Sequence, residues 1–178
     1  MTLAGVATPE AILAELTAVF ERADAGQLGA LAAAVDRAER VFLAGQGRSG
    51  LIAAAVAVRI GHLGWPAHVA GEATCPAIGP GDLLIAFSKN GTTEVTLHQA
   101  RRAAAAGAEV AAITAAPGSP LAELASPAVI LPVGESAQHA GSLFEQSALV
   151  LGDALCALLQ ASRGLDGAQL AARHDNLQ

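Results

Sequence analysis

One stretch organises the chain: Val41-Phe42-Leu43-Ala44-Gly45-Gln46-Gly47-Arg48-Ser49-Gly50. Its four leading apolar residues are typical of a parallel strand that is covered on both faces. The glycines that follow permit positive φ angles and let a ligand approach the backbone closely. Ser49 is expected to cap a helix that runs from about Gly50 to His62. The free N–H groups at the start of that helix favour an anion such as phosphate.

The rest of the chain alternates between apolar, strand-like runs and helical patterns. Further strands are expected at residues 67–70, 83–87, 109–114 and 128–132. Helices are expected at 94–106, 121–125 and 142–162, and two leading helices at 9–23 and 28–38, with Thr8 as a cap and a break at Gly26. This order predicts an α/β fold, a three-layer α/β/α sandwich of flavodoxin-like type with a five-stranded parallel sheet.

The composition predicts one domain over residues 1–178. With 53% hydrophobic and 15% charged residues, the chain has enough apolar surface to predict a homo-oligomer. A net charge of -6, with 10 Lys and Arg, argues against a nucleic-acid partner. No uninterrupted apolar run is long enough to cross a membrane, and residues 1–5 lack a basic signal-peptide region. Cys75 and Cys156 fit a reducing cytoplasm and form no disulfide framework.

A second polar turn, Ser88-Lys89-Asn90-Gly91-Thr92-Thr93, follows the expected strand at 83–87. Its hydroxyls and amide, together with the N–H groups of the next helix, make a phosphate cradle. The alternative is a polar turn in which Thr92 or Thr93 only caps that helix, and Lys89 is expected to be solvated. Ligands of parallel sheets bind beyond the carboxyl ends of the strands, so both turns are expected to face one site.

The first turn also matches the dinucleotide fingerprint Gly45-x-Gly47-x-x-Gly50. Glu72, after the second expected strand, stands about where a ribose-binding acid would lie. A nicotinamide cofactor and a tight turn needed only for packing are therefore both possible interpretations. The dinucleotide interpretation leaves the second turn unexplained.

Longer segments resemble a known family. They are residues 47–51, 59–64, 71–72 and 81–85, the segment Gly141-Ser142-Leu143-Phe144-Glu145-Gln146, and the tail His174-Asp175-Asn176-Leu177. Together they cover most of the chain and resemble the sugar isomerase (SIS) domain family, and within it the 6-phospho-3-hexuloisomerases. The last two segments are the most specific part of the resemblance.

The resemblance implies an isomerase that interconverts D-arabino-3-hexulose 6-phosphate and D-fructose 6-phosphate through an enediolate, without a metal or redox cofactor. Glu145 is the expected base; the alternative is a carboxylate that only favours the positive helix end. His174 is the expected partner that moves protons between oxygens, or else a solvated tail residue. The expected substrate and phosphate ligands are Gly47, Arg48, Ser49, Ser88, Asn90, Thr93 and Glu72.

Departures from the family's pattern leave the substrate open. The family's phosphate loop usually has the pattern Ser-x-Ser-Gly-x-Thr, whereas this chain has Asn90 for the second serine and Thr92 where Glu is common. An isomerase of another sugar phosphate, such as arabinose 5-phosphate, is one alternative, and a non-catalytic sugar-phosphate sensor is another. The expected assembly is a dimer or tetramer, and it is open whether the C-terminal tail completes a neighbouring subunit's site.

Overall fold

Five parallel strands form one sheet in the computed structural model, which describes residues 7–174. The strands are β1 (Val41–Gly45), β2 (Ala67–Val69), β3 (Leu83–Phe87), β4 (Glu109–Thr114) and β5 (Ala128–Ile130). Their order across the sheet is β2-β1-β3-β4-β5, which is flavodoxin-like. The order reverses between β1 and β3, and ligands of such sheets bind beyond the carboxyl ends of the strands at that point.

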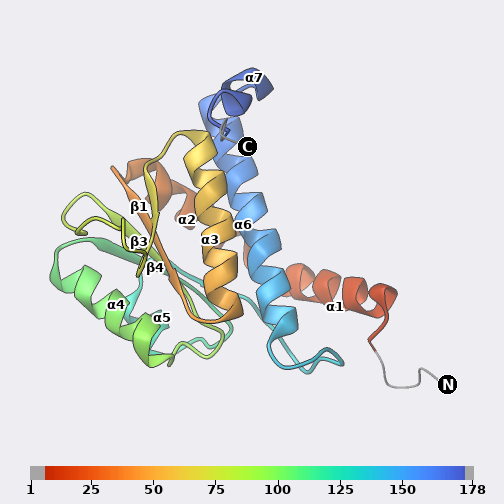
Figure 1. Ribbon diagram of the computed structural model, residues 1–178. Helices are drawn as coiled ribbons and strands as arrows, with labels where there is room; N and C mark the ends of the chain where they lie inside the picture. Colours follow the sequence, from red (N-terminus) through yellow and green to blue (C-terminus); the bar gives the residue numbers. More distant parts are fainter. Residues whose placement is uncertain (1–6, 175–178) are drawn as a thin grey trace.

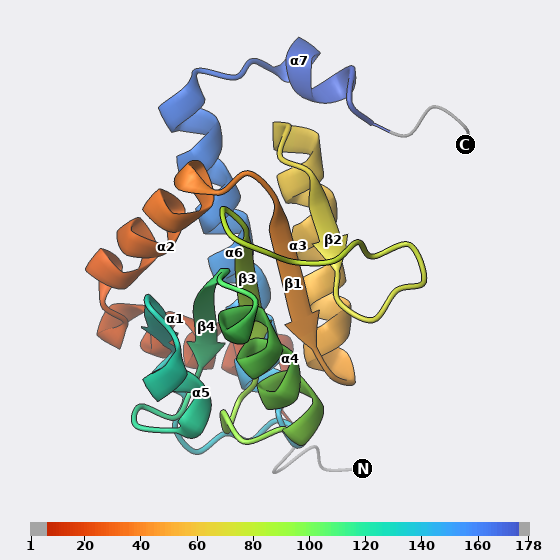
Figure 2. The ribbon, with the colours of Figure 1, turned by 90° about the vertical axis from the view of Figure 1, so that its left-hand side faces the viewer.

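Helices cover both faces of the sheet (Figures 1 and 2). On one face lie α2 (Ala25–Arg37), α3 (Arg48–Leu63) and α6 (Ser142–Arg163), with α1 (Pro9–Arg22) packed on α6. On the other face lie α4 (Glu94–Ala105) and α5 (Pro120–Leu124), and α7 (Gly167–Ala171) follows α6. The predicted three-layer α/β/α sandwich with two leading helices is therefore confirmed.

The neighbouring strands β1 and β3 are apolar along their whole length because each one supplies side chains to two cores. In β1, Val41 and Leu43 enter the larger core, between the sheet and the helices α2, α3 and α6. Phe42 and Ala44 point the other way, into the smaller core beneath α4 and α5. Every residue of β3 is buried. Burial on both faces explains why the strands show no alternation of polar and apolar residues.

The helix starts confirm one sequence signal and correct another. Thr8 caps α1 as expected, since its side chain accepts a hydrogen bond from the N–H of Ala11 at 3.3 Å. The second helix begins at Ala25, earlier than expected, because the side chain of Asp24 accepts a hydrogen bond from the N–H of Gly26 at 2.8 Å. The expectation that Gly26 breaks the helical region is wrong, because this glycine lies inside α2.

The chain after α6, which the sequence predicts to be a tail, contains a short helix. The side chain of Asp166 accepts from the N–H of Gln169 at 2.8 Å, and the side chain of Gln169 accepts from the N–H of Asp166 at 2.9 Å. This capping box starts α7, and its Asp-x-x-Gln spacing is a signal that could have predicted the helix. The family-like tail residues 175–177 and the N-terminal residues 1–5 lie outside the described residues.

Helix α6 is long and apolar enough to cross a membrane by length and composition alone. Its most apolar window has a mean hydropathy of 1.4, and half of that window is buried. Leu143, Leu151 and Leu155 belong to the larger core, where α6 packs against α1, α2 and α3. Because α6 packs on three other helices and its apolar run is interrupted by Glu145 and Gly152, it is a core helix of the domain.

Candidate functional site

The first glycine turn joins β1 to α3 at the point where the strand order reverses. Helix α3 begins at Arg48, with Gly47 at the cap position in a positive-φ conformation (φ 58°) and no side-chain cap. The expected capping role of Ser49 is therefore wrong, because Ser49 already lies inside the first helical turn. Without a side-chain cap, the N–H groups at the start of α3 remain available to an anionic ligand.

The three glycines of this turn are required for different structural reasons. A Cβ on Gly45 would stand 2.8 Å from the carbonyl carbon of Ser49, and a Cβ on Gly50 would stand 2.8 Å from the carbonyl oxygen of Gly45. Close backbone packing therefore requires both residues to be glycine. Gly47 has no atom within 4 Å of its Cβ position and needs glycine for its φ angle instead. With the flavodoxin-like strand order, this packing accounts for the fingerprint spacing without a dinucleotide.

The second turn, residues 88–93, lies beside the first because β1 and β3 are neighbours. The buried Ser88 places its Oγ 3.0 Å from the Oγ1 of Thr93, and the same Oγ accepts from the N–H of Gly91 at 3.2 Å. Thr93 occupies the cap position of α4, but its side chain makes no cap bond because its hydroxyl meets Ser88. Asn90 lies exposed in the turn. The expected phosphate cradle is therefore a turn held by its own hydrogen bonds, and it precedes a helix that has no side-chain cap.

Glu145 lies in the first turn of α6 and faces the start of α3. The Nε of Arg48 donates to the Oε2 of Glu145, in an ion pair that joins the first turns of the two helices. The Glu145 side chain is only 14% exposed, whereas that of Arg48 is 64% exposed. The structure thus brings the expected base and one expected phosphate ligand together at the edge of the sheet that carries both glycine turns.

A cavity of about 400 Å³ lies beside Glu145, under the loop of residues 134–141. Its walls are formed by Lys89, Val133, Gly134, Glu135, Ser136, Ala140, Gly141, Leu143 and Phe144. Lys89 was expected to be solvated, but it is half-buried and lines this cavity. A Cβ on Gly141 would stand 3.4 Å from the Oε1 of Glu145 and 3.8 Å from the Cδ of Lys89, so both side chains border the same glycine.

Glu15, on α1, holds the loop that forms this cavity, although no motif in the sequence points to it. Its carboxylate accepts hydrogen bonds from the Oγ of Ser136 at 2.7 Å, the N–H of Ala137 at 2.9 Å and the Nε2 of Gln138 at 2.8 Å. These bonds, above all the one from Ser136, lower the pKa of Glu15. No local pattern links residues that are more than a hundred positions apart, so only the folded chain reveals this contact.

Glu72 lies exposed in the loop after β2. Because β2 is parallel to β1 and beside it, this loop leaves the sheet at the same edge as the first glycine turn. Within residues 7–174, no hydrogen bond or ion pair joins Glu72 to Arg48 or Glu145. Its expected place near the sugar thus agrees with the topology, and its contact with a ligand stays a prediction.

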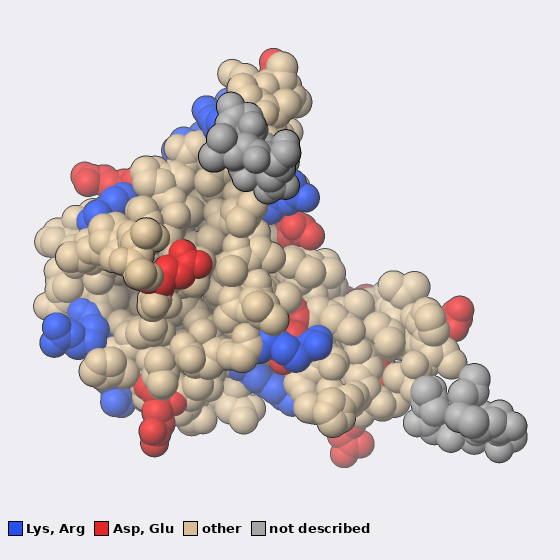
Figure 3. All heavy atoms as spheres, in the orientation of Figure 1, with Lys and Arg blue, Asp and Glu red and all other residues tan. Residues whose placement is uncertain are grey.

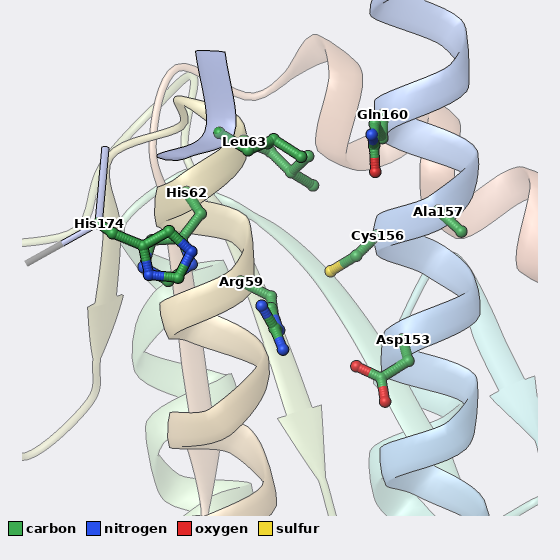
Figure 4. Close-up of a pocket in the computed structure, with 9 residues that line it drawn as sticks. Arg59, His62, Leu63, Asp153, Cys156, Ala157, Gln160 and His174 are labelled. Atoms are coloured by element: carbon green, nitrogen blue, oxygen red, sulfur yellow. The ribbon is translucent and has the colours of Figure 1, made fainter. Parts of the chain in front are cut away.

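His174 lies at the opposite end of α3 from Glu145. Its ring packs against that of His62, with ring centroids 3.9 Å apart and ring planes tilted by 35°, at the border of a second cavity between α3 and α6 (Figure 4). Helix α3 rises about 21 Å from Arg48 to His62 at ~1.5 Å per residue. The predicted partnership of Glu145 and His174 is therefore not formed within one chain. Burial, followed by the nearby His174 and Arg59, lowers the pKa of His62.

Within residues 7–174, no cluster of three or more His, Cys, Asp or Glu side chains is arranged to hold a metal ion. Cys75 and Cys156 are free thiols. Burial raises the pKa of both, that of Cys156 to about 11. A thiol with a raised pKa is a poor nucleophile at neutral pH, so neither cysteine is a candidate for catalysis.

Residues 35–157, from the end of α2 into α6, match the family model of the SIS domain. The chain belongs to the SIS domain family. The matched part of this SIS domain includes both glycine turns, Lys89 and Glu145, and ends before His174. The resemblance inferred from the sequence is thereby confirmed at the level of the family.

Relatives that are named for a function match this SIS domain over most of its length. It is 41% identical over 172 residues to a 3-hexulose-6-phosphate isomerase of Mycobacterium gastri, covering 92% of this chain and 86% of the relative. It is 36% identical to a protein of that name from Bacillus subtilis, covering 78% and 80%. A crystal structure of a Methanococcus jannaschii protein, said to infer a molecular function of 3-hexulose-6-phosphate isomerase, matches with a TM-score of 0.86 and 31% identity, covering 94% and 97%.

Proposed function

We propose that this SIS domain is a 3-hexulose-6-phosphate isomerase, an activity also called 6-phospho-3-hexuloisomerase. It interconverts D-arabino-3-hexulose 6-phosphate and D-fructose 6-phosphate. The observation that carries the proposal is the 41% identity, over 92% of the chain, to a relative with that name. The geometry supports it, because two uncapped helix starts that suit a phosphate lie beside a largely buried carboxylate.

The substrate's phosphate binds at the edge of the sheet where the neighbouring strands β1 and β3 lead into α3 and α4. Hydroxyl, amide and backbone N–H donors converge there, and the exposed Arg48 guanidinium adds a positive charge. Glu72, in the loop after β2, faces the sugar hydroxyls. The proposed phosphate ligands are Gly47, Arg48, Ser49, Ser88, Asn90 and Thr93.

Glu145 is the proposed base. Its carboxylate takes the proton from C2 of the 3-keto sugar, the C–H electrons form the C2–C3 double bond, and the C3 oxygen takes the negative charge. A proton moves from the C2 hydroxyl to the C3 oxygen, and Glu145 returns its proton to C3, which leaves the carbonyl at C2. Substrate and product have the same oxidation state, so the reaction moves protons only. Arg48, on the Oε2 of Glu145, orients the carboxylate.

A substrate panel tests the proposal. Purified protein is incubated separately with fructose 6-phosphate and arabinose 5-phosphate, and the sugar phosphates are followed by NMR. Formation of the 3-hexulose from fructose 6-phosphate is the expected result. Turnover of arabinose 5-phosphate alone would assign the protein to the rival isomerase, and binding of either compound without turnover would make it a sensor. Asn90→Ser restores the family's usual serine and is expected to keep the activity.

We further propose that the protein is a homo-oligomer that packs through α3 and α6. Figure 3 shows mostly uncharged side chains over these two helices. Five large apolar side chains on α1, α3 and α6 are between 45% and 70% exposed: Leu13, Leu51, Val58, Val150 and Leu158. Burying such surface stabilises association by about 25 cal/mol per Å² of apolar area.

A two-fold axis across α3 and α6 would also unite the separated catalytic candidates. Glu145 lies at one end of this helix pair and His174 at the other. Antiparallel packing of two copies therefore brings His174 of the partner subunit beside Glu145. In that position an imidazole is suited to move the proton between the C2 and C3 oxygens.

Complementation between inactive variants tests the shared site. Glu145→Gln and His174→Asn are each expected to lose activity, and a mixed dimer of the two keeps one site with both native residues. After unfolding and refolding together, an equal mixture should recover about a quarter of the wild-type activity, because half of the dimers are mixed and each has one intact site of two. No recovery from two variants that are each inactive would show that each site belongs to a single chain, and a His174→Asn variant that is active alone would show that His174 has no role.

We propose a cytoplasmic location without nucleic-acid or membrane partners. The net charge of -6 disfavours binding to phosphate backbones and to anionic lipid surfaces. The free thiols of Cys75 and Cys156 suit a reducing compartment. Cell fractionation tests the location, and recovery of the protein in the membrane fraction would contradict it.

A further inference from the structure

Lys89 extends from the phosphate turn toward the proposed base. Its backbone is anchored, since its carbonyl oxygen accepts from the N–H of Ala115 at 2.9 Å and from the Oγ1 of Thr114 at 3.1 Å. Its side chain reaches Gly141, where the Cβ position lies 3.8 Å from the Cδ of Lys89 and 3.4 Å from the Oε1 of Glu145. Arg48 holds the other oxygen, Oε2. Lys89 and the Oε1 of Glu145, which is the oxygen that Arg48 does not bind, therefore both lie beside Gly141.

The ammonium group of Lys89 is available to a ligand. The ion pairs found within residues 7–174 do not include it, and no hydrogen bond of its side chain is formed there. The half-buried side chain lines the cavity of about 400 Å³, so its N–H donors can meet a ligand there. A cation that is partly removed from water and lacks a partner is stabilised when a ligand brings negative charge.

We propose that Lys89 is a catalytic residue that stabilises the enediolate; this rests on the proposed isomerase function. When Glu145 removes the proton from carbon, the electrons of the C–H bond move toward the neighbouring carbonyl oxygen. The Lys89 ammonium keeps its protons and donates a hydrogen bond to that oxygen while it carries the charge. The proton of the neighbouring hydroxyl then moves to that oxygen, and Glu145 returns its proton to the carbon that carried the carbonyl, which leaves the carbonyl on the neighbouring carbon. A positioned donor of this kind stabilises the transition state more than the ground state.

The position of Lys89 fits the reacting carbons better than the phosphate. The proposed phosphate site centres on Ser88 and Thr93, whose hydroxyl oxygens lie 3.0 Å apart at the base of the turn. The Lys89 side chain leaves that turn and runs to Gly141, at the start of the helix that carries Glu145. A lysine that bound only phosphate would affect KM, whereas a donor to the developing charge affects kcat.

Steady-state kinetics with fructose 6-phosphate test the assignment in the full-length protein. Lys89→Met keeps the length of the side chain and removes its charge, and Lys89→Arg keeps the charge. Loss of one oxyanion donor lowers kcat by about 100-fold, so Lys89→Met should show that loss, with KM changed by less than about threefold. Lys89→Arg should recover at least about a tenth of the wild-type kcat, because a donating cation remains. Arg101→Met, an exposed cation on α4, is the control and should not change either constant.

The outcomes separate this inference from the function on which it rests. A wild-type kcat in Lys89→Met, or a loss confined to KM, would overturn the role of Lys89 and leave the isomerase intact. Calorimetric titration with inorganic phosphate should give the same Kd for wild type and Lys89→Met, and a Kd at least about tenfold weaker in the variant would make Lys89 a phosphate ligand instead. A wild-type protein that does not turn over fructose 6-phosphate would overturn both proposals.

Discussion

A single methyl group at Gly152 is predicted to destabilise the protein by forcing α3 and α6 apart. A Cβ at this glycine would stand less than 3.0 Å from the Cγ2 of Val56 and 3.5 Å from its Cγ1. Val56 is only 2% exposed, and a β-branched side chain in a helix has one strongly preferred rotamer, so it cannot turn away. Helix α6 would have to move by about 1 Å to restore an ordinary carbon–carbon contact.

The magnitude follows from two opposing effects. Overpacking of a core costs about 1–3 kcal/mol. Replacing glycine by alanine inside a helix stabilises by about 1 kcal/mol. Gly152→Ala should therefore lower the free energy of unfolding by about 1 kcal/mol, which lowers Tm by about 2–4 °C in a chain of this size. Urea and thermal unfolding measure the change.

Gly29→Ala, in the middle of α2, is the matched control. No atom lies within 4 Å of its Cβ position, so only the helix-propensity gain of about 1 kcal/mol is expected there. Adding Val56→Ala to Gly152→Ala should relieve the clash, with a coupling energy of about 1–2 kcal/mol. The packing of α3 against α6 also aligns Arg48 with Glu145, so Gly152→Ala should lower kcat as well. A Gly152→Ala variant that is as stable and as active as Gly29→Ala would refute the packing argument.

Three further predictions concern side chains that are buried or that hold a loop by hydrogen bonds. Asp82→Asn should cost about 2 kcal/mol, because Asp82 is 2% exposed and accepts two hydrogen bonds from the partly exposed Arg40, at 2.8 and 2.6 Å. Burial raises the pKa of Asp82, but the hydrogen bonds from Arg40 and from the N–H of Gly79 outweigh burial and lower the pKa. The stabilisation from Asp82 is therefore present above pH 3.8, its ordinary pKa, and is lost as the pH falls through the pKa of the folded state. Urea unfolding at low pH measures this loss. Glu15→Gln should speed amide exchange in residues 136–138 about tenfold, whereas Glu21→Gln, on the same helix, should not. Cys156, with its pKa raised to about 11, should react with maleimide at pH 8 about 100-fold more slowly in the folded than in the unfolded protein.

The sheet and its two turns were predictable because their signals are local. The run from Val41 to Ala44 is apolar because both faces of the sheet are covered, and the turn after β3 shows its polar residues in one short segment. The start of α3 was predicted wrongly because the conformation of a neighbouring residue decides where that helix begins. Ser49 does not cap α3, because the positive φ of Gly47 lets the helix begin at Arg48, two residues earlier than expected.

The parts of the site that the sequence could not reveal depend on tertiary contacts. Glu15 meets residues 136–138 only because α1 packs on α6. The direction of Lys89 depends on the position of Gly141, which lies on another loop. The role of His174 stays a prediction from the tail motif, and its distance from Glu145 follows from the parallel course of α3 and α6, which no spacing in the sequence encodes.

Deuterium exchange tests the central claim, that Glu145 is the base of a phosphohexulose isomerisation. Fructose 6-phosphate is incubated in deuterated water with wild-type protein and with Glu145→Gln, and the hydrogen on C3 is followed by NMR. Loss of a positioned base slows proton transfer by about 10²–10⁴-fold. The predicted result is therefore deuterium at C3 and formation of the 3-hexulose with wild type, and neither on that timescale with Glu145→Gln. Equal exchange by the two proteins, or none by either, would contradict the claim.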